Sequence, residues 1–162
     1  MQLEGSHKAR GVRFALVVSR YHDFVTDRLQ AGALAALEAA DVRPDEVTIV
    51  RVPGAFEIPA AAQRLAETRQ FGAIVCLGCV IRGGTPHFEY IASAVAHGLM
   101  SAAAATGVPM SFGVLTTNSV EDALERAGAG PANKGWEAAV AAVEMATLLK
   151  DIGAGVVPGI RV

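Results

Sequence analysis

The sequence predicts a three-layer α/β/α sandwich whose central sheet has four parallel strands. Short, almost continuous apolar runs alternate with longer segments of helical spacing. Strands that are apolar on both faces are typical of parallel sheets covered by helices on both sides. The 162 residues contain no internal repeat, linker or low-complexity block. We therefore expect a single domain over 1–162, with a polar N-terminal arm at 1–11 and a C-terminal tail at 151–162.

The first half of the chain predicts two strand and helix pairs. We expect a buried strand at Val12–Val18 and a helix at Asp23–Ala40, whose large apolar residues recur at helical spacing. The second pair is a strand at Val47–Val52 and a helix at Ile58–Thr68, with a proline that a first helical turn tolerates. Helices of this kind make the crossovers that parallel strands require.

The second half continues the alternation. The apolar run Ala73–Ile81 predicts the third strand, Pro86–Ala105 a long helix and Met110–Thr116 the fourth strand. Right-handed crossovers between these strands place helices on both faces of the sheet.

Two more helices are expected after the fourth strand. Asn118 fits an N-cap with Glu121 three residues on, and Gly128 fits the stop after Arg126. A last helix is predicted at about Gly135–Lys150, and the tail to residue 162 has no clear period.

The charge and the apolar content of the chain indicate which kinds of binding partner to expect. The net charge is −2 and there is no basic run, so we expect neither nucleic acid nor an anionic membrane surface as a partner. No apolar stretch reaches the length of a membrane span, and the polar N-terminus lacks the apolar core of a signal peptide. A cytoplasmic protein is the resulting expectation. The apolar content of 52% suits a subunit that buries further surface against its own copies.

Two cysteines form a C-x-x-C spacing at Cys76 and Cys79. A redox pair of this spacing lies at a helix N-terminus, whereas these two lie inside an apolar strand, where residues three apart point to opposite faces. Two ligands without a second pair are also too few for a structural zinc site. We interpret both as small buried residues and expect no metal.

The predicted fold locates the functional site. Ligands of open parallel sheets bind beyond the carboxyl ends of the strands. In this chain, aromatic, charged and glycine residues gather in the segments that follow the strands, at 19–22, 53–57, 82–87 and 116–118.

The segment after the third strand has the features of an anion site next to a proton-transfer group. Thr85 fits an N-cap and Pro86 a first helical residue, which would place His87 at the second helical position. A helix start offers free N–H groups to an anion such as phosphate, and Gly83 and Gly84 allow a ligand close to the backbone. Histidine can donate or accept a proton near neutral pH. The alternative is an ordinary strand-to-helix turn with a well-capped helix.

Other candidate residues are ambiguous individually. Glu57 could accept hydrogen bonds from substrate hydroxyl or ring N–H groups, with Phe56 and Tyr21 as stacking surfaces, or it could simply be favoured by a helix N-terminus. Arg126 suits a phosphate but is also favoured near a helix C-terminus. Lys134 opens the last helix, where the helix dipole does not favour a cation.

Together, these segments resemble the lumazine synthase family, whose members make 6,7-dimethyl-8-ribityllumazine in riboflavin biosynthesis. The similarity covers about residues 14–149. The motifs that carry it, in order, are VPGAFEIP (52–59), GCVIRGGTPHFEY (78–90), FGVLTT (112–117) and ERAGAGPANKG (125–135). The resemblance implies a flavodoxin-like sandwich and a condensation of 5-amino-6-(D-ribitylamino)uracil with 3,4-dihydroxy-2-butanone 4-phosphate. Phosphate and water leave, and no metal or organic cofactor is implied.

The resemblance also implies roles for residues that bind the phosphorylated ketone. His87 takes the place of the proton-transfer histidine. Gly84 and Thr85 would bind the ketone phosphate with Arg126, which we count with His87 as catalytic. Lys134 matches a lysine near that phosphate.

The remaining implied contacts concern the pyrimidine. Tyr21 would stack on the ring, where the family often has Phe or Trp, and Phe112 would come from a neighbouring subunit because these sites lie between subunits. His22 stands where Asn is frequent. The ring and ribityl chain would contact Ala55, Phe56, Glu57, Cys79, Val80 and Ile81.

Two alternatives remain open, a non-catalytic flavin or phosphate carrier and a shell-forming protein with vestigial sites. The family forms pentamers, which in some members assemble into icosahedral shells. The apolar excess agrees with self-association but does not choose among these states.

Overall fold

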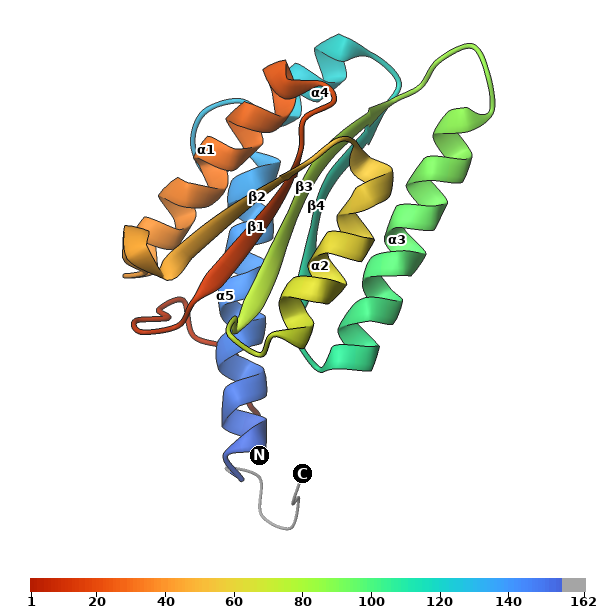
Figure 1. Cartoon of the computed structure of the whole chain (residues 1–162). Coiled ribbons are helices and arrows are strands. Elements are labelled where there is room, and N and C mark those ends of the chain that lie inside the picture. Colours follow the sequence, from red (N-terminus) through yellow and green to blue (C-terminus); the bar gives the residue numbers. More distant parts are fainter. Residues whose placement is uncertain (156–162) are drawn as a thin grey trace.

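The computed structural model describes residues 1–155, so residues 156–162 of the expected C-terminal tail lie outside the described part. Its sheet consists of β1 (Phe14–Ser19), β2 (Val47–Val52), β3 (Ala73–Ile81) and β4 (Met110–Thr117). All three strand pairings are parallel, in the order β2-β1-β3-β4 (Figure 1). The predicted four-stranded parallel sheet is confirmed, and its order is that of flavodoxin-like sheets.

Helices cover both faces of this sheet (Figure 1). The α-helices of the described residues are α1 (Asp23–Ala39), α2 (Ile58–Glu67), α3 (His87–Thr106), the short α4 (Val120–Arg126) and α5 (Lys134–Gly153). Two 3-10 turns, Pro44–Glu46 and Ala55–Glu57, precede β2 and α2. One core cluster includes residues of α1, α4 and α5, and a second includes residues of α2 and α3, so each face has its own helices.

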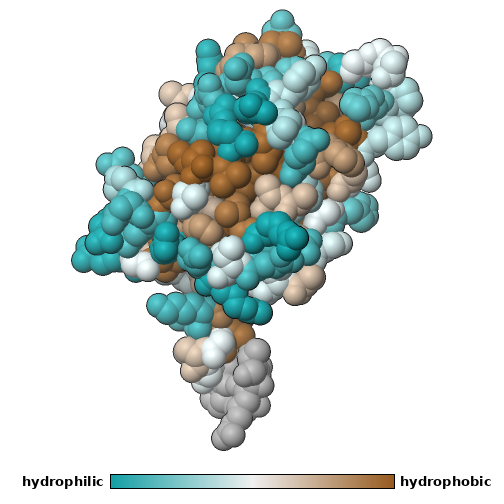
Figure 2. Space-filling view, in the orientation of Figure 1, coloured by the Kyte–Doolittle hydropathy of each residue, from teal (hydrophilic) through white to brown (hydrophobic). Residues whose placement is uncertain are grey.

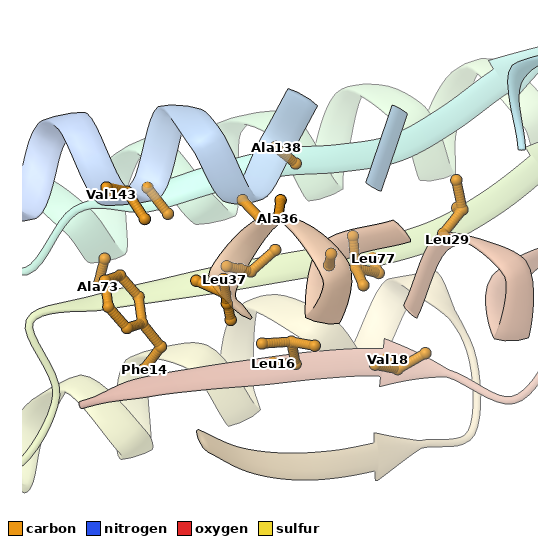
Figure 3. Close-up of a cluster of buried hydrophobic side chains, with 14 of the residues drawn as sticks. Phe14, Leu16, Val18, Leu29, Ala36, Leu37, Ala73, Leu77, Ala138 and Val143 are labelled. Carbon is orange, nitrogen blue, oxygen red and sulfur yellow. The ribbon is translucent and has the colours of Figure 1, made fainter. Parts of the chain in front are cut away.

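The pleat of the strands divides the core between the two faces. Phe14, Leu16 and Val18 point towards α1 and α5, where they pack with residues such as Leu37 (Figure 3). The alternate residues Ala15 and Val17 belong to the cluster under α2 and α3. All six residues of β1 are buried, because this strand lies inside the sheet with helices above and below it.

The two cysteines follow the same pleat. Cys76 belongs to the α2 and α3 cluster and Cys79 to the α1 and α5 cluster, and both are buried free thiols. The prediction that they point to opposite faces of β3 is confirmed.

The polar N-terminal arm packs against its own chain. The Ser6 N–H donates to Thr147 Oγ1 at 2.8 Å, and His7 Nδ1 lies 3.2 Å from Glu144 Oε1. The Ala9 N–H donates to Ala40 O at 2.9 Å, directly after the end of α1. In Figure 1 the N-terminus accordingly lies beside the end of α5.

The surface is partly apolar. Figure 2 shows apolar residues gathered over the sheet beside α2, with polar residues around them. Within residues 1–155, no helix combines the length and hydropathy that a membrane crossing would need. The exposed apolar surface is in keeping with the self-association expected from the composition.

Some boundaries differ from the prediction. The side chain that caps α4 belongs to Ser119, whose Oγ accepts from the Asp122 N–H at 3.1 Å, and not to Asn118. Helix α5 begins at Lys134 and continues to Gly153, so the expected tail starts inside the helix.

Candidate active site

A cavity of about 430 Å³ lies beyond the carboxyl ends of β1, β2 and β3, and we call it the His87 cavity. It opens next to the point where the strand order reverses, between β1 and β3, which is where ligands of such sheets bind. The predicted site residues that line it are Tyr21, Ala55, Phe56, Glu57, Cys79, Val80, Ile81, Thr85 and His87. The structure therefore brings most of the predicted site together in one chain.

Backbone pairing that continues past the strands positions the first wall of this cavity. The Arg20 N–H donates to Val52 O at 2.8 Å, and the Tyr21 N–H donates to Pro53 O at 3.1 Å. Thr26 Oγ1 donates to Ser19 O at 2.7 Å and fixes the start of α1. Tyr21, a residue 68% exposed, is consequently held beside the loop that follows β2.

His22 is a cavity residue whose local structure the sequence did not reveal. It precedes α1 in the left-handed conformation, with φ 60° and ψ 46°. Its ring centroid lies 4.3 Å from that of Tyr21 and 5.8 Å from that of Phe24. Partial burial lowers its pKa from the usual 6.5, so the ring is neutral at pH 7.

Glu57 enters the cavity from the turn between β2 and α2. Its N–H donates to Gly54 O at 3.3 Å, which closes the turn. A methyl group at Gly54 would lie 3.2 Å from Glu57 Oε2. The missing side chain of Gly54 therefore leaves room for the carboxylate.

The end of β3 forms the apolar floor. Cys79 is 3% exposed, and burial raises the pKa of its thiol to about 11. Val80 is also buried, with 9% of its surface exposed, and Ile81 is half-buried. A neutral thiol and two aliphatic side chains line this wall and give it no charge.

His87 begins α3, but the helix start differs from the prediction. Pro86 occupies the N-cap position without a side-chain hydrogen bond, and His87 is the first helical residue. The expectation that Thr85 caps the helix is wrong, because no side chain at this helix start makes the capping bond. Gly83 and Gly84 would have no neighbour within 4 Å of an added methyl group, so their backbone is open to a ligand.

Three other predicted residues line a different hollow, and Gly84 lines neither of the two. A groove of about 500 Å³ follows β4 and the first turns of α5, and Phe112, Arg126 and Lys134 line it. We call it the β4 groove. Within one chain, Arg126 and Lys134 do not join His87. The phosphate site that the resemblance implies, with Arg126 beside Thr85, is therefore not formed within one chain. The reason is the strand order, since β4 is an edge strand.

The cations of the β4 groove have local partners. Lys134 Nζ lies 2.8 Å from Glu137 Oε2, one turn further along α5. Arg126 Nη1 donates to Asp122 O at 3.1 Å, and its side chain is exposed. The Lys134 side chain is 43% exposed, so an anion from outside the chain can reach both cations.

Comparison with known proteins identifies the family. The family model of 6,7-dimethyl-8-ribityllumazine synthase matches residues 11–150. The chain belongs to this family. A 6,7-dimethyl-8-ribityllumazine synthase of Syntrophus aciditrophicus (strain SB) is 50% identical over 149 residues, which are 92% of this chain and 97% of that protein. The predictions of family, transferase activity and place in riboflavin biosynthesis are confirmed.

The lumazine synthase match spans both hollows, from Tyr21 to Lys134, and begins at the end of the N-terminal arm. It contains two further residues that sequence reasoning left out, Arg82 and Asn133. Asn133 caps α5 by accepting from the Gly135 and Trp136 N–H groups at 2.8 and 3.2 Å, directly before Lys134. An asparagine at a predicted helix start was the available signal.

The side chains of the described residues also bear on whether the chain could hold a metal ion. No group of three His, Cys, Asp or Glu side chains within residues 1–155 is arranged to hold a metal ion.

Proposed function

We propose that this chain condenses the ribitylaminouracil with the phosphorylated ketone at a site that two copies build together. One copy would supply the His87 cavity and its neighbour the β4 groove. One observation carries this proposal: Arg126 and Lys134 line a groove separate from the cavity that holds His87. A phosphoester needs cations, and the His87 cavity contains no lysine or arginine among its lining residues in the described part of the chain.

The pyrimidine is the substrate that suits the apolar part of the cavity. Its ring would stack on Tyr21, and the wall formed by Cys79 and Val80 would exclude water from one face. Glu57 offers carboxylate oxygens to the substrate hydroxyl and N–H groups at the other end. Phe112 would close the ring site from the neighbouring copy.

The ketone phosphate suits the start of α3. The open backbone at Gly83–Thr85 and the first N–H groups of a 20-residue helix favour an anion. Arg126 and Lys134 of the neighbour would complete the phosphate site, because charge-assisted hydrogen bonds are strongest between a cation and phosphate.

The chemistry then needs proton transfer and alignment. The substrate amine attacks the ketone carbonyl and releases water as an imine forms. Elimination of phosphate gives an enol, which becomes a second carbonyl, and the second amine attacks this carbonyl and releases a second water as the ring closes. We assign the proton transfers to His87, a role worth typically ~10²–10⁴-fold in rate. Alignment of two reactants can contribute ~7–11 kcal/mol, so we expect His87→Ala to retain measurable activity.

Sharing of the site requires assembly. We propose pentamers or larger shells of pentamers, supported by the exposed apolar residues and by the outer edge of β4, which no other strand of residues 1–155 pairs. Light scattering of the purified protein distinguishes these sizes. The cytoplasmic location stays a prediction that cell fractionation can check.

Mixed refolding of two impaired variants tests the shared site. We would refold His87→Ala and Arg126→Ala copies together and follow lumazine formation by absorbance, at a low ketone phosphate concentration where each variant alone is slow. Random assembly pairs an intact cavity with an intact groove at about a quarter of the sites, and we expect that share of native activity.

Three outcomes would contradict the proposal. If mixed copies show only the mean of the separate variants, the site lies within one chain. If the native protein binds riboflavin but forms no lumazine, the carrier alternative holds. Full activity of His87→Ala at saturating substrates and every pH would exclude His87 as the proton-transfer group.

A further inference from the structure

The loop that holds the proposed phosphate site has few internal restraints. Residues 82–87 are all exposed, and no side chain caps the helix that His87 begins. Gly83 and Gly84 have no neighbour that would contact an added side chain. A catalytic ring at the end of such a loop needs another restraint to keep its place, because catalysis is sensitive to small misplacements.

Arg82 supplies contacts on both sides of this loop. Its backbone N–H donates to Thr117 O at 2.8 Å, which extends the pairing of β3 with β4. Its Nε donates to Asn118 Oδ1 at 2.9 Å, in the loop that follows β4. Its Nη1 donates to Glu89 Oε1 in the first turn of α3, and its guanidinium carbon lies 4.5 Å from the centre of the Phe88 ring.

These contacts connect three elements around His87. The strand end, the loop after β4 and the first turn of α3 meet at one planar group, and Phe88 itself lines the His87 cavity. Glu89 is a well-matched partner, since hydrogen bonds from its own backbone N–H and from Arg82 lower the pKa of its carboxyl group. The carboxylate therefore stays charged at neutral pH.

We propose that Arg82 is a positioning residue for the condensation, which holds Gly83–Thr85 and His87 at a fixed distance from each other. This inference rests on the proposed function of the His87 cavity. Arg82 acts through its neighbours, with Nε and Nη1 both used inside the chain. A lysine cannot replace it, because one ammonium group cannot donate in two fixed directions and stack on Phe88 at the same time.

The test compares Arg82→Lys and Arg82→Gln with the native enzyme in the assembled state. We expect kcat to fall at least tenfold at saturating substrates, towards the hundredfold that a misplacement of ~1 Å costs. The free energy of unfolding in urea should hardly change, because exposed ion pairs contribute little to stability. Arg82→Lys should fail to rescue kcat, whereas a purely electrostatic role would be rescued.

A matched control and a double variant sharpen the comparison. Arg64 is an exposed arginine of α2 paired with Glu67 at 3.1 Å, and Arg64→Gln should leave kcat and KM unchanged. Asn118→Ala should lower kcat less than Arg82→Gln does. Combined with Arg82→Gln it should add nothing, because the contact is already lost.

The outcomes separate this inference from the proposed function. Arg82 variants within twofold of native kcat would overturn the positioning role while lumazine formation still supports the function. A rise in KM for the ketone phosphate, and in the inhibition constant of inorganic phosphate, with unchanged kcat would overturn it too, since Arg82 would then bind the anion directly. A native protein without lumazine formation would refute the function itself.

Discussion

Replacing Asn133 with alanine should lower the free energy of unfolding by about 2–4 kcal/mol. The residue is 3% exposed and makes four hydrogen bonds. Its Oδ1 caps α5, which is worth ~1 kcal/mol. Its Nδ2 donates to Arg28 O at 3.2 Å and to Gly128 O at 2.8 Å, and each such bond contributes ~0.5–1.5 kcal/mol.

A glycine on the facing helix gives an independent perturbation of the same side chain. A methyl group at Gly32 of α1 would lie 2.2 Å from Asn133 Oδ1 and 2.9 Å from its Nδ2. Gly32→Ala should therefore displace the amide and destabilise the protein, despite a gain of ~1 kcal/mol in helix propensity. Gly153→Ala is the matched control, because nothing lies within 4 Å of a methyl group there.

Urea unfolding at a fixed subunit concentration is the assay, since assembly makes stability depend on concentration. The fluorescence of Trp136, the single tryptophan, reports on the start of α5. In the Asn133→Ala background, Gly32→Ala should no longer cost stability, because the atoms it clashes with are gone. An equal cost in both backgrounds would refute this account of the α1 and α5 contact.

Two further predictions concern titratable groups. Neither thiol should react with a disulfide reagent at pH 8 in the native protein, because burial raises the pKa of Cys79 to about 11 and also that of Cys76, while both should react in urea; one fast native thiol would contradict this. His22→Asn keeps a residue that tolerates the left-handed conformation but removes the ring. Because the pKa of His22 is lower in the folded state than the ordinary 6.5, the unfolded state binds the proton more readily, and native stability should fall as pH drops through 6.5. The variant should lose less stability over the same range, and parallel urea midpoints across pH would contradict it.

The sequence predicted the strands well because continuous apolar runs report burial on both faces. The run at Ala73–Ile81 matches β3 at both ends. β1 begins two residues later than expected, at Phe14, because strand pairing starts where its partners Val47 and Ala73 begin. Hydropathy reports burial and contains no information on register.

Individual site residues were predictable from the sequence, but their separation into the His87 cavity and the β4 groove was not. Motifs after the strands identified Glu57, Thr85 and His87, and these do meet in one cavity. The separation of Arg126 from them follows from the order of the strands, which depends on pairing between distant segments. The left-handed His22 and the contacts of Arg82 were equally invisible, since both arise from tertiary packing.

The segment between β4 and α5 links the two hollows of one chain. It begins at Asn118, which Arg82 contacts at the start of the loop of residues 82–87. It ends at Asn133, whose amide donates to Gly128 O next to the end of α4. Between these points, α4 is seven residues long and carries Arg126 at its last turn.

Because this segment is held at both ends, the chain that positions His87 for its own cavity also positions Arg126 in its own groove. If neighbouring copies share their sites, each copy contributes to two of them, and Arg82 lies where the two contributions meet. With such a rigid connection, the contact between two copies would align the cavity of one copy with the groove of the other, and the individual loops would not have to move. On this account, the arginine at position 82 joins the end of β3 to the loop after β4 while it also contacts α3, because its branched guanidinium donates in two directions.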